Sequence, residues 1–356
     1  MTEVFRISFL SFHSDNLKPV LSMVEGSAIQ NPKWLGLSVI AFVLVLAGAL
    51  ATAQQTKKIP RIGFLGSTSF SGNPARREAF RQGLRELGYV EGKTIDVEWR
   101  FAEGKAERLP GLAAELVRLK VDVIVTGGSA VTRAAKAATL TIPIIMAQDN
   151  DPVGSGFVTS LAHPGGNITG LSTLAPELSG KQLELLKEIV PRLSRVAVLG
   201  TSTRAGNAQA LKETELAAAA LDVQLQYLDI LDSKDIETAF RTVSKKRFDA
   251  ILVLDSTLRD YSTQVAETAL KSHVPAIYFD STVVEKGGLM SYATNISDLA
   301  RRAAIYVDKI LKGAKPADLP VEQPTKFEFV INLKAAKQIG LTIPPNVLAQ
   351  ADKIMK

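Results

Sequence analysis

Apolar and polar residues follow two alternating rhythms along the chain from residue 61 onward. Short runs of apolar, often β-branched residues alternate with longer segments in which apolar residues recur at every third or fourth position. The first pattern is typical of strands that are buried on both faces, and the second of amphipathic helices. Because strands and helices alternate, the sequence predicts an α/β fold with parallel sheets and right-handed crossovers.

These rhythms set the expected limits of each element. Strands are expected at 61–66, 94–100, 142–147, 195–200, 224–230, 250–255, 276–280, 288–294 and 327–331. Helices are expected at 73–87, 105–119, 178–190, 207–221, 233–245, 262–272, 296–312 and 333–339. Gly88 is expected to end the first helix as a C-cap.

The segment 121–139 (VDVIVTGGSAVTRAAKAAT) predicts a buried strand, a sharp turn and an alanine-rich helix. Gly127 and Gly128 allow a ligand to approach the turn backbone closely. Ser129 is expected to be the N-cap of the helix, whose partial positive charge would attract a carboxylate or phosphate. An ordinary strand-to-helix connection would show the same pattern, so this segment alone does not decide between the two readings.

The strand–helix pattern occurs twice, in two series separated by the turn-rich run 163–167 (HPGGN). Each series opens with a similar strand, RIGFLG at 61–66 and RVAVLG at 195–200, followed by hydroxyl residues. The 356 residues suffice for two α/β domains of medium size. We therefore expect two doubly wound lobes rather than one long sheet.

The predicted carboxyl ends of the strands carry many small hydroxyl and acidic residues. Ligands of open α/β sheets bind at these ends, so two facing lobes would form a cleft lined by such loops. Helix capping explains many of these residues individually, but six such loops at one edge favour a binding cleft. The loops are Ser67-Thr68, Gly128-Ser129, Gln148-Asp149-Asn150-Asp151, Thr201-Ser202, Asp255-Ser256 and Asp280-Ser281.

Composition removes several classes of function. The chain has no cysteine, which excludes disulfides, thiolate zinc sites and cysteine nucleophiles. Its formal charge of +6 is spread along the chain without basic runs between aromatics, so nucleic-acid binding is not expected. The three histidines, His13, His163 and His273, accompany no recognisable nucleophile, phosphate-loop or zinc-protease motif. We therefore expect neither an enzyme nor a cofactor or metal site.

The N-terminal region has the features of an export signal. Lys33 precedes an uncharged apolar run at 34–50, which is followed by Ala51-Thr52-Ala53-Gln54. Such a small-residue ending predicts cleavage after Ala53, with an uncleaved membrane anchor as the alternative. No cysteine follows the cleavage site, so a lipoprotein is not expected. Translation could start at Met1 or at Met23, and the second start would give a signal of ordinary length.

Five runs of the sequence, taken in order, carry a resemblance to a known family. Over residues 58–354 they resemble substrate-binding proteins of ABC importers, and more narrowly the type I periplasmic-binding family that includes the tryptophan/tyrosine-type binding proteins. The runs are 83–93 (GLRELGYVEGK), 121–130 (VDVIVTGGSA), 164–169 (PGGNIT), 275–295 (PAIYFDSTVVEKGGLMSYATN) and 329–341 (FVINLKAAKQIGL).

The resemblance implies two parallel-sheet lobes joined by a hinge of three crossings, near Gly170, Thr294 and Pro320. The implied order is a signal peptide at 1–53, lobe 1 at 58–169 with 295–319 returning to it, and lobe 2 at 170–294 with 320–356 returning to it. Carried over from the family, the ligand carboxylate would meet Ser67, Thr68, Gly128, Ser129 and Ala130. An ammonium or hydroxyl group would meet Asp149, Asp151, Asp255 or Asp280, and Gln148, Thr201, Ser202, Ser256 and Ser281 complete the expected site.

The function implied is that of a monomeric periplasmic protein that captures a small polar ligand, such as an amino acid, between its lobes. It would deliver this ligand to an ABC permease in the inner membrane. The alternative is a ligand sensor that signals to a membrane partner instead of feeding transport. Aromatic residues make up only 6% of the chain. Near the expected cleft they are Phe70, Tyr278, Phe279 and Tyr292; one of Tyr278 and Phe279 must face the core, and Tyr292 suits packing.

Overall fold

The computed structural model describes residues 58–71, 74–190, 192–203, 206–254 and 261–356. Residues 59–356 form one compact unit. The predicted signal peptide, Asp255 and Ser256 lie outside the described residues. Within the described part of the chain, no helix is both long and apolar enough to span a membrane.

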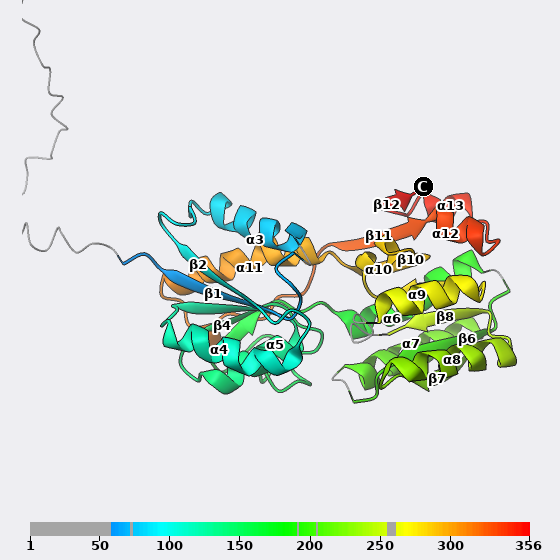
Figure 1. The fold of residues 1–356 in the computed structure, drawn as a ribbon, viewed down its shortest axis with the longest axis horizontal. Coiled ribbons are helices and arrows are strands. Elements are labelled where there is room, and N and C mark those ends of the chain that lie inside the picture. The colour runs from blue at the N-terminus through cyan, green and yellow to red at the C-terminus, as the bar shows by residue number, and fades with distance from the viewer. Residues whose placement is uncertain (1–57, 72–73, 191, 204–205, 255–260) are drawn as a thin grey trace, which may run out of the picture. The chain divides into compact units, whose positions relative to one another are not determined.

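The first sheet has five parallel strands in the order β2-β1-β3-β4-β5. Helices α4 and α5 cover one face of this sheet, and α3 and α11 cover the other (Figure 1). We call this sheet and its four helices the first lobe. Its strands are β1 (Arg61–Gly66), β2 (Asp96–Phe101), β3 (Val123–Gly127), β4 (Ile144–Gln148) and β5 (Ile168–Gly170). Its helices are α3 (Pro74–Glu86), α4 (Leu109–Arg118) after the 3-10 turn η2 (Ala106–Arg108), α5 (Ser129–Ala138) and α11 (Ile296–Leu311).

The second sheet has seven strands in the order β12-β11-β10-β9-β8-β6-β7, and we call it with its helices the second lobe. All neighbours are parallel except β10 and β11, which are antiparallel. The strands are β6 (Arg195–Gly200), β7 (Gln224–Asp229), β8 (Ala250–Val253), β9 (Ala276–Tyr278), β10 (Met290–Thr294), β11 (Phe327–Asn332) and β12 (Lys353–Met355). The helices are α6 (Ala175–Ile189), α7 (Asn207–Leu221), α8 (Ser233–Lys246), α9 (Ser262–Lys271), α10 (Ser281–Glu285), α12 (Leu333–Gln338) and α13 (Pro345–Leu348).

Each lobe buries apolar side chains on both faces of its sheet. In the first lobe, Ile62 and Phe64 of β1 face α3 and α11, whereas Leu65 faces α4 and α5. The contact between α3 and α11 is close, because a Cβ added at Gly83 would lie 2.3 Å from the Arg301 carbonyl oxygen. Glycine at this position therefore lets a helix late in the chain pack onto an early one.

The chain passes between the lobes three times. The first passage joins β5 to α6, the second joins β10 to α11, and the third joins the 3-10 turn η4 (Pro316–Asp318) to β11. Neighbouring passages are hydrogen-bonded: the Thr294 hydroxyl donates to the Thr173 carbonyl, and the Ser172 amide donates to the Glu322 carbonyl at 2.9 Å. The three passages thus lie side by side as one bundle of extended chain.

The α/β fold with parallel sheets is confirmed, and four details differ from the sequence-based prediction. β11 runs antiparallel to β10. The three-residue strands β5 and β12 and the short helices α10 and α13 were not expected, since each is too short to show a period. The start of α5 also differs, because Gly128 and not Ser129 is its N-cap.

Candidate ligand-binding site

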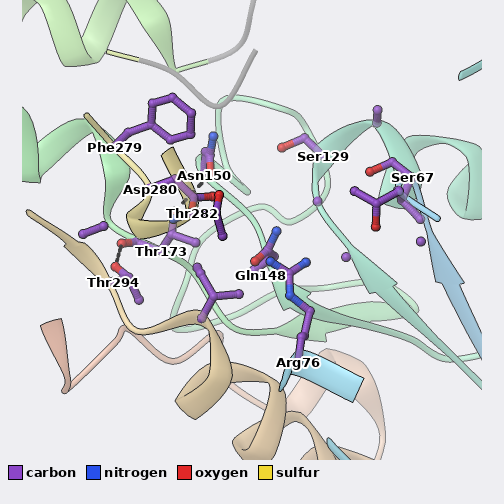
Figure 2. Close-up of a pocket in the computed structure, with 18 of the residues that line it drawn as sticks. Ser67, Arg76, Ser129, Gln148, Asn150, Thr173, Phe279, Asp280, Thr282 and Thr294 are labelled. Carbon is purple, nitrogen blue, oxygen red and sulfur yellow. Dashed lines mark hydrogen bonds between the residues drawn. The ribbon is translucent and has the colours of Figure 1, made fainter. Parts of the chain in front are cut away.

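A pocket of about 1010 Å³ lies where the carboxyl ends of strands from both sheets meet (Figure 2). Residues of both lobes line it, together with Thr173 and Thr294 of the passages between them. Eight of the residues predicted from sequence line this pocket: Ser67, Thr68, Gly128, Ser129, Ala130, Gln148, Asp280 and Ser281.

The turn from β3 to α5 forms part of the first lobe's wall. Gly128 has φ 118° and ψ 160°, a backbone conformation that L side chains rarely adopt. The Gly128 carbonyl accepts the Thr132 amide at 3.0 Å, and the Thr132 hydroxyl contacts the Thr126 hydroxyl at 2.8 Å inside the core. These bonds fix the helix start, and the first amides of α5, which have no partner within the helix, belong to residues that line the pocket.

Gln148, at the end of β4, lies in the centre of the pocket together with Arg76 of α3 (Figure 2). The Gln148 side chain is only 9% exposed, and its Oε1 atom is buried with no hydrogen-bond partner among the described residues. Arg76 extends to the β3–α5 turn, since a Cβ added at Gly127 would lie 3.5 Å from Arg76 Nη1. An amide and a guanidinium group therefore face the same space as the start of α5.

The second lobe contributes the segment between β9 and α10. Asp280 is the N-cap of α10, and its Oδ1 accepts the Thr282 amide at 2.9 Å. The preceding two side chains point in opposite directions: Tyr278 is 1% exposed in the core, whereas Phe279 lines the pocket (Figure 2). Strand alternation had left open which of the two faces the core, and the structure assigns this position to Tyr278.

Among the residues that the structure describes, four aromatic rings line the pocket: Phe64, Phe101, Phe279 and Tyr292. Tyr292 stacks on Phe327 with ring centroids 6.0 Å apart, which agrees with the packing role expected for it. Phe101 contacts Phe70 edge-on at 5.5 Å. The apolar surface of the pocket therefore comes from both lobes.

The charged residues that line the pocket are separated by sign. Among the described residues, the first lobe contributes Arg76, Arg77 and Arg133, and the second contributes Asp280, Glu285 and Glu328. Within this acidic wall, Glu285 is paired with Lys353 at 2.9 Å. A ligand with a negative and a positive end would match this arrangement.

Four predicted site residues have structural roles outside the pocket lining. Asp151 accepts the Gly154 amide at 2.8 Å within its own turn. The Thr201 hydroxyl donates to the Ile230 carbonyl at 2.8 Å, and the Ser202 hydroxyl donates to Asp229 at 2.6 Å, so both hydroxyls join β6 to the end of β7. These contacts account for the hydroxyl and acidic residues at these loops without a ligand.

Asp149 is the fourth of these residues, and it lies behind the pocket wall with no exposed surface. Burial raises its pKa to about 7, although the Ser129 hydroxyl, the Asp151 amide and the charge of Arg133 act in the opposite direction. Its Oδ1 accepts the Asp151 amide at 3.1 Å, whereas Oδ2 has no hydrogen-bond partner among the described residues. The carboxyl group therefore acts on the site only through its neighbours.

Comparison with known families places this pocket in context. Residues 66–355 match the family model described as ABC transporter substrate binding protein. The chain belongs to this family. Members of this non-enzymatic class typically act outside the cytoplasm, where they bind a small-molecule ligand and present it to an ABC permease.

Relatives of the chain include proteins with named ligands. The tyrosine-binding protein of Clostridioides difficile is 24% identical over 286 residues, which cover 80% of this chain and 82% of the relative. A solved ABC domain from Streptococcus pneumoniae in complex with L-Trp is 28% identical with a TM-score of 0.76, over 83% of this chain and 99% of that one. A conserved domain protein from Vibrio cholerae is 30% identical with the same TM-score, over 83% and 100% of the two chains.

Several residues that line the pocket were absent from the sequence-based prediction. Arg76 and Arg77 fall inside a predicted helix, where two adjacent arginines suggest only a solvated surface. Thr173 and Thr294 belong to the passages between lobes, and Thr282 follows an unexpected helix start. A signal was available for the arginines, because the first turn of their helix contains no acidic residue.

Proposed function

We propose that this substrate-binding protein captures a zwitterionic α-amino acid with an aromatic or large apolar side chain. The separation of charge across the pocket carries this proposal, since cationic groups line one wall and acidic groups line the other. The carboxylate of the ligand would face the first lobe, and its ammonium group would face Asp280. Two charge-assisted hydrogen bonds and one buried ring suffice for about −8 kcal/mol, which corresponds to a micromolar Kd.

The aromatic lining supports a ring in the ligand. Phe279 and Phe101 offer ring surfaces from opposite lobes, and paired rings contribute about 0.5–1.5 kcal/mol beyond the area that they bury. The names of two relatives, a tyrosine-binding protein and an L-Trp complex, agree with this ligand class. The proposed contacts are Ser67, Thr68, Gly128, Ser129, Ala130, Gln148, Asp280 and Ser281.

Titration calorimetry of the purified protein tests this proposal. L-tryptophan, L-tyrosine and L-phenylalanine are expected to bind with micromolar Kd, and ribose and glucose are expected not to bind. At about 100 times its Kd a ligand adds about 2.7 kcal/mol to the stability, so the same panel is expected to raise the melting temperature. Binding of a sugar without any amino acid would contradict the proposal.

We further propose that the protein works as a monomer in the periplasm after cleavage behind Ala53, and that it needs no nucleic acid. The apolar run at 34–50 and the small residues after it support cleavage. Mass spectrometry of the exported protein is expected to find Gln54 as its first residue. A mature chain that retains residues 34–50 would instead indicate a membrane-anchored protein.

A further inference from the structure

Two arginines occupy a position on α3 that helix stability does not explain. Arg76 and Arg77 lie in the first turn of the helix, which contains no acidic residue, and Glu78, which follows it, is paired with Arg85 at 2.6 Å. A positive charge at this end of a helix is repelled by the helix dipole, at a cost of about 0.3–1 kcal/mol. Both residues line the pocket.

Arg76 lies next to the N-terminus of α5, which is a second source of positive potential. Its Nη1 atom reaches the turn at Gly127, immediately before the first amides of α5. Its Nε atom is buried, and Figure 2 shows the side chain extending from α3 toward Gln148. A guanidinium group and a helix start that face the same point form an arrangement suited to a planar anion such as a carboxylate.

Gln148 supplies an independent indication that a ligand group belongs at this point. Its side chain is more than nine-tenths buried and lines the pocket, yet its amide oxygen has no hydrogen-bond partner within the described residues. A buried polar atom without a partner costs about 1–3 kcal/mol. A ligand with both donors and acceptors, such as an α-amino acid, can satisfy this amide while its carboxylate contacts Arg76.

The side chains of Arg77 and Arg133 contact aromatic rings. The Arg77 guanidinium lies 3.7 Å from the centroid of the Phe70 ring, and the Arg133 guanidinium lies 5.3 Å from that of Phe157. These cation–π contacts hold both guanidinium groups against rings of the first lobe. Arg76 is the cation of the first lobe's wall that shares the centre of the pocket with Gln148 (Figure 2).

We propose that Arg76 is the principal anchor for the carboxylate of the ligand, acting together with the first amides of α5. This inference rests on the proposed function and makes an acid group an essential part of the ligand. It differs from the sequence-based expectation, in which hydroxyl groups and helix amides alone held the carboxylate. The planar guanidinium would bind both carboxylate oxygens, which a lysine at the same position could not do.

Calorimetry with three probes and three variants tests the role of Arg76. The probes are L-tryptophan, indole-3-propionate, which lacks the ammonium group, and L-tryptophanamide, which lacks the carboxylate. Arg76→Gln is expected to weaken binding of the two carboxylates about ten- to hundred-fold, the effect of one lost charge-assisted bidentate contact. The amide is expected to bind Arg76→Gln and the unmodified protein with the same weak affinity. Arg76→Lys is expected to fall between Arg76→Gln and the unmodified protein.

Arg81→Gln is the matched control. Arg81 lies on the same helix and outside the pocket, where it is paired with Glu91 at 2.7 Å, and its replacement changes the net charge equally. The control is expected to change each affinity less than two-fold. Equal losses for all three probes in Arg76→Gln, or no loss, would overturn the role of Arg76. The unmodified protein alone also provides a test. L-tryptophanamide is expected to bind it much more weakly than L-tryptophan does.

The same experiment separates this inference from the proposed function. If the unmodified protein binds none of the aromatic amino acids, the proposed function is wrong. Benzoate and indole-3-propionate then test Arg76 alone: carboxylate binding that Arg76→Gln abolishes would support the anion site. Absence of carboxylate binding in the unmodified protein would overturn both.

Discussion

Asp149 shows how one buried side chain can make the stability of the protein depend on pH. Burial raises its pKa to about 7, whereas an unfolded chain would ionise this group near pH 4. Between these two values the folded state keeps a proton that the unfolded state has lost. The contribution of Asp149 to the stability therefore decreases as the pH rises from about 4 to about 7, and it is constant above that range.

The variant Asp149→Asn is expected to lack this pH dependence. The amide can still accept the Asp151 hydrogen bond but carries no charge to be desolvated. Relative to the unmodified protein, the free energy of unfolding of the variant is expected to rise with pH from 4 to 7, by at most about 4 kcal/mol. Thermal melting at pH 4, 5.5, 7 and 8.5 measures the difference.

Asp249→Asn provides a control of opposite sign. Burial acts to raise the pKa of Asp249, but hydrogen bonds from Ser194 and Arg195 outweigh it and hold the pKa below its usual value. This carboxylate stabilises the protein above pH 4, so its loss is expected to matter more as the pH rises from 2 to 4. A stability difference between Asp149→Asn and the unmodified protein that does not vary with pH would show that Asp149 ionises normally.

At the scale of elements, the short helix α10 combines a structural and a binding role in one residue. Asp280 caps the helix through the Thr282 amide and also lines the pocket. The two roles can be separated, because asparagine caps a helix as well as aspartate but carries no charge. We expect Asp280→Asn to weaken L-tryptophan binding about ten-fold while the melting temperature stays within a few degrees.

Asp280→Ala is expected to show both effects, with an additional loss of about 1 kcal/mol in the free energy of unfolding. Asp232→Ala is the control, because Asp232 caps α8 through the Lys234 and Asp235 amides and does not line the pocket. This control is expected to lose stability without losing affinity. An unchanged affinity in Asp280→Asn would mean that the ammonium group of the ligand binds elsewhere.

Most helices and strands were predictable from the sequence because their apolar residues recur at a clear spacing. Helix α7 and strand β6 begin and end at the expected residues, and the limits of the other long elements differ by a few positions. The elements that were not predicted have three to five residues, and their pairing or packing is set by tertiary contacts. β12, for example, is held by its pairing with β11 in a register that no local pattern encodes.

The site was predictable only in part, for a physical reason. Loop position predicted Ser67, Ser129 and Asp280, which line the pocket, because ligands of open sheets bind at the ends of strands. The same rule selected Thr201 and Ser202, whose hydroxyl groups instead join two strands. Arg76 was missed because a side chain of its length reaches the pocket from a helix, and only the packing of α3 determines where it ends.

At the scale of the whole molecule, the two charged walls of the pocket lie on the two lobes that the three passages connect. The cationic wall and the acidic wall are carried by different lobes, and Thr173 and Thr294 of the passages lie between them. A zwitterion bound as proposed would interact with both lobes at once. A ligand with only one charge would make a charged contact with one wall alone. Closure of the two lobes around such a ligand would then gain less binding free energy.

The return of α11 to the first lobe also has a consequence for the order in which the protein can fold. Phe80 and Leu84 of α3 are covered by Ala300, Ala303 and Ala304, more than 200 residues later in the chain. The second sheet is completed later still, by the pairing of β11 with β12. The core on one face of each sheet therefore includes residues from the last part of the chain, and contacts of such long range form slowly. A chain organised in this way completes both lobes only when its last elements have been synthesised.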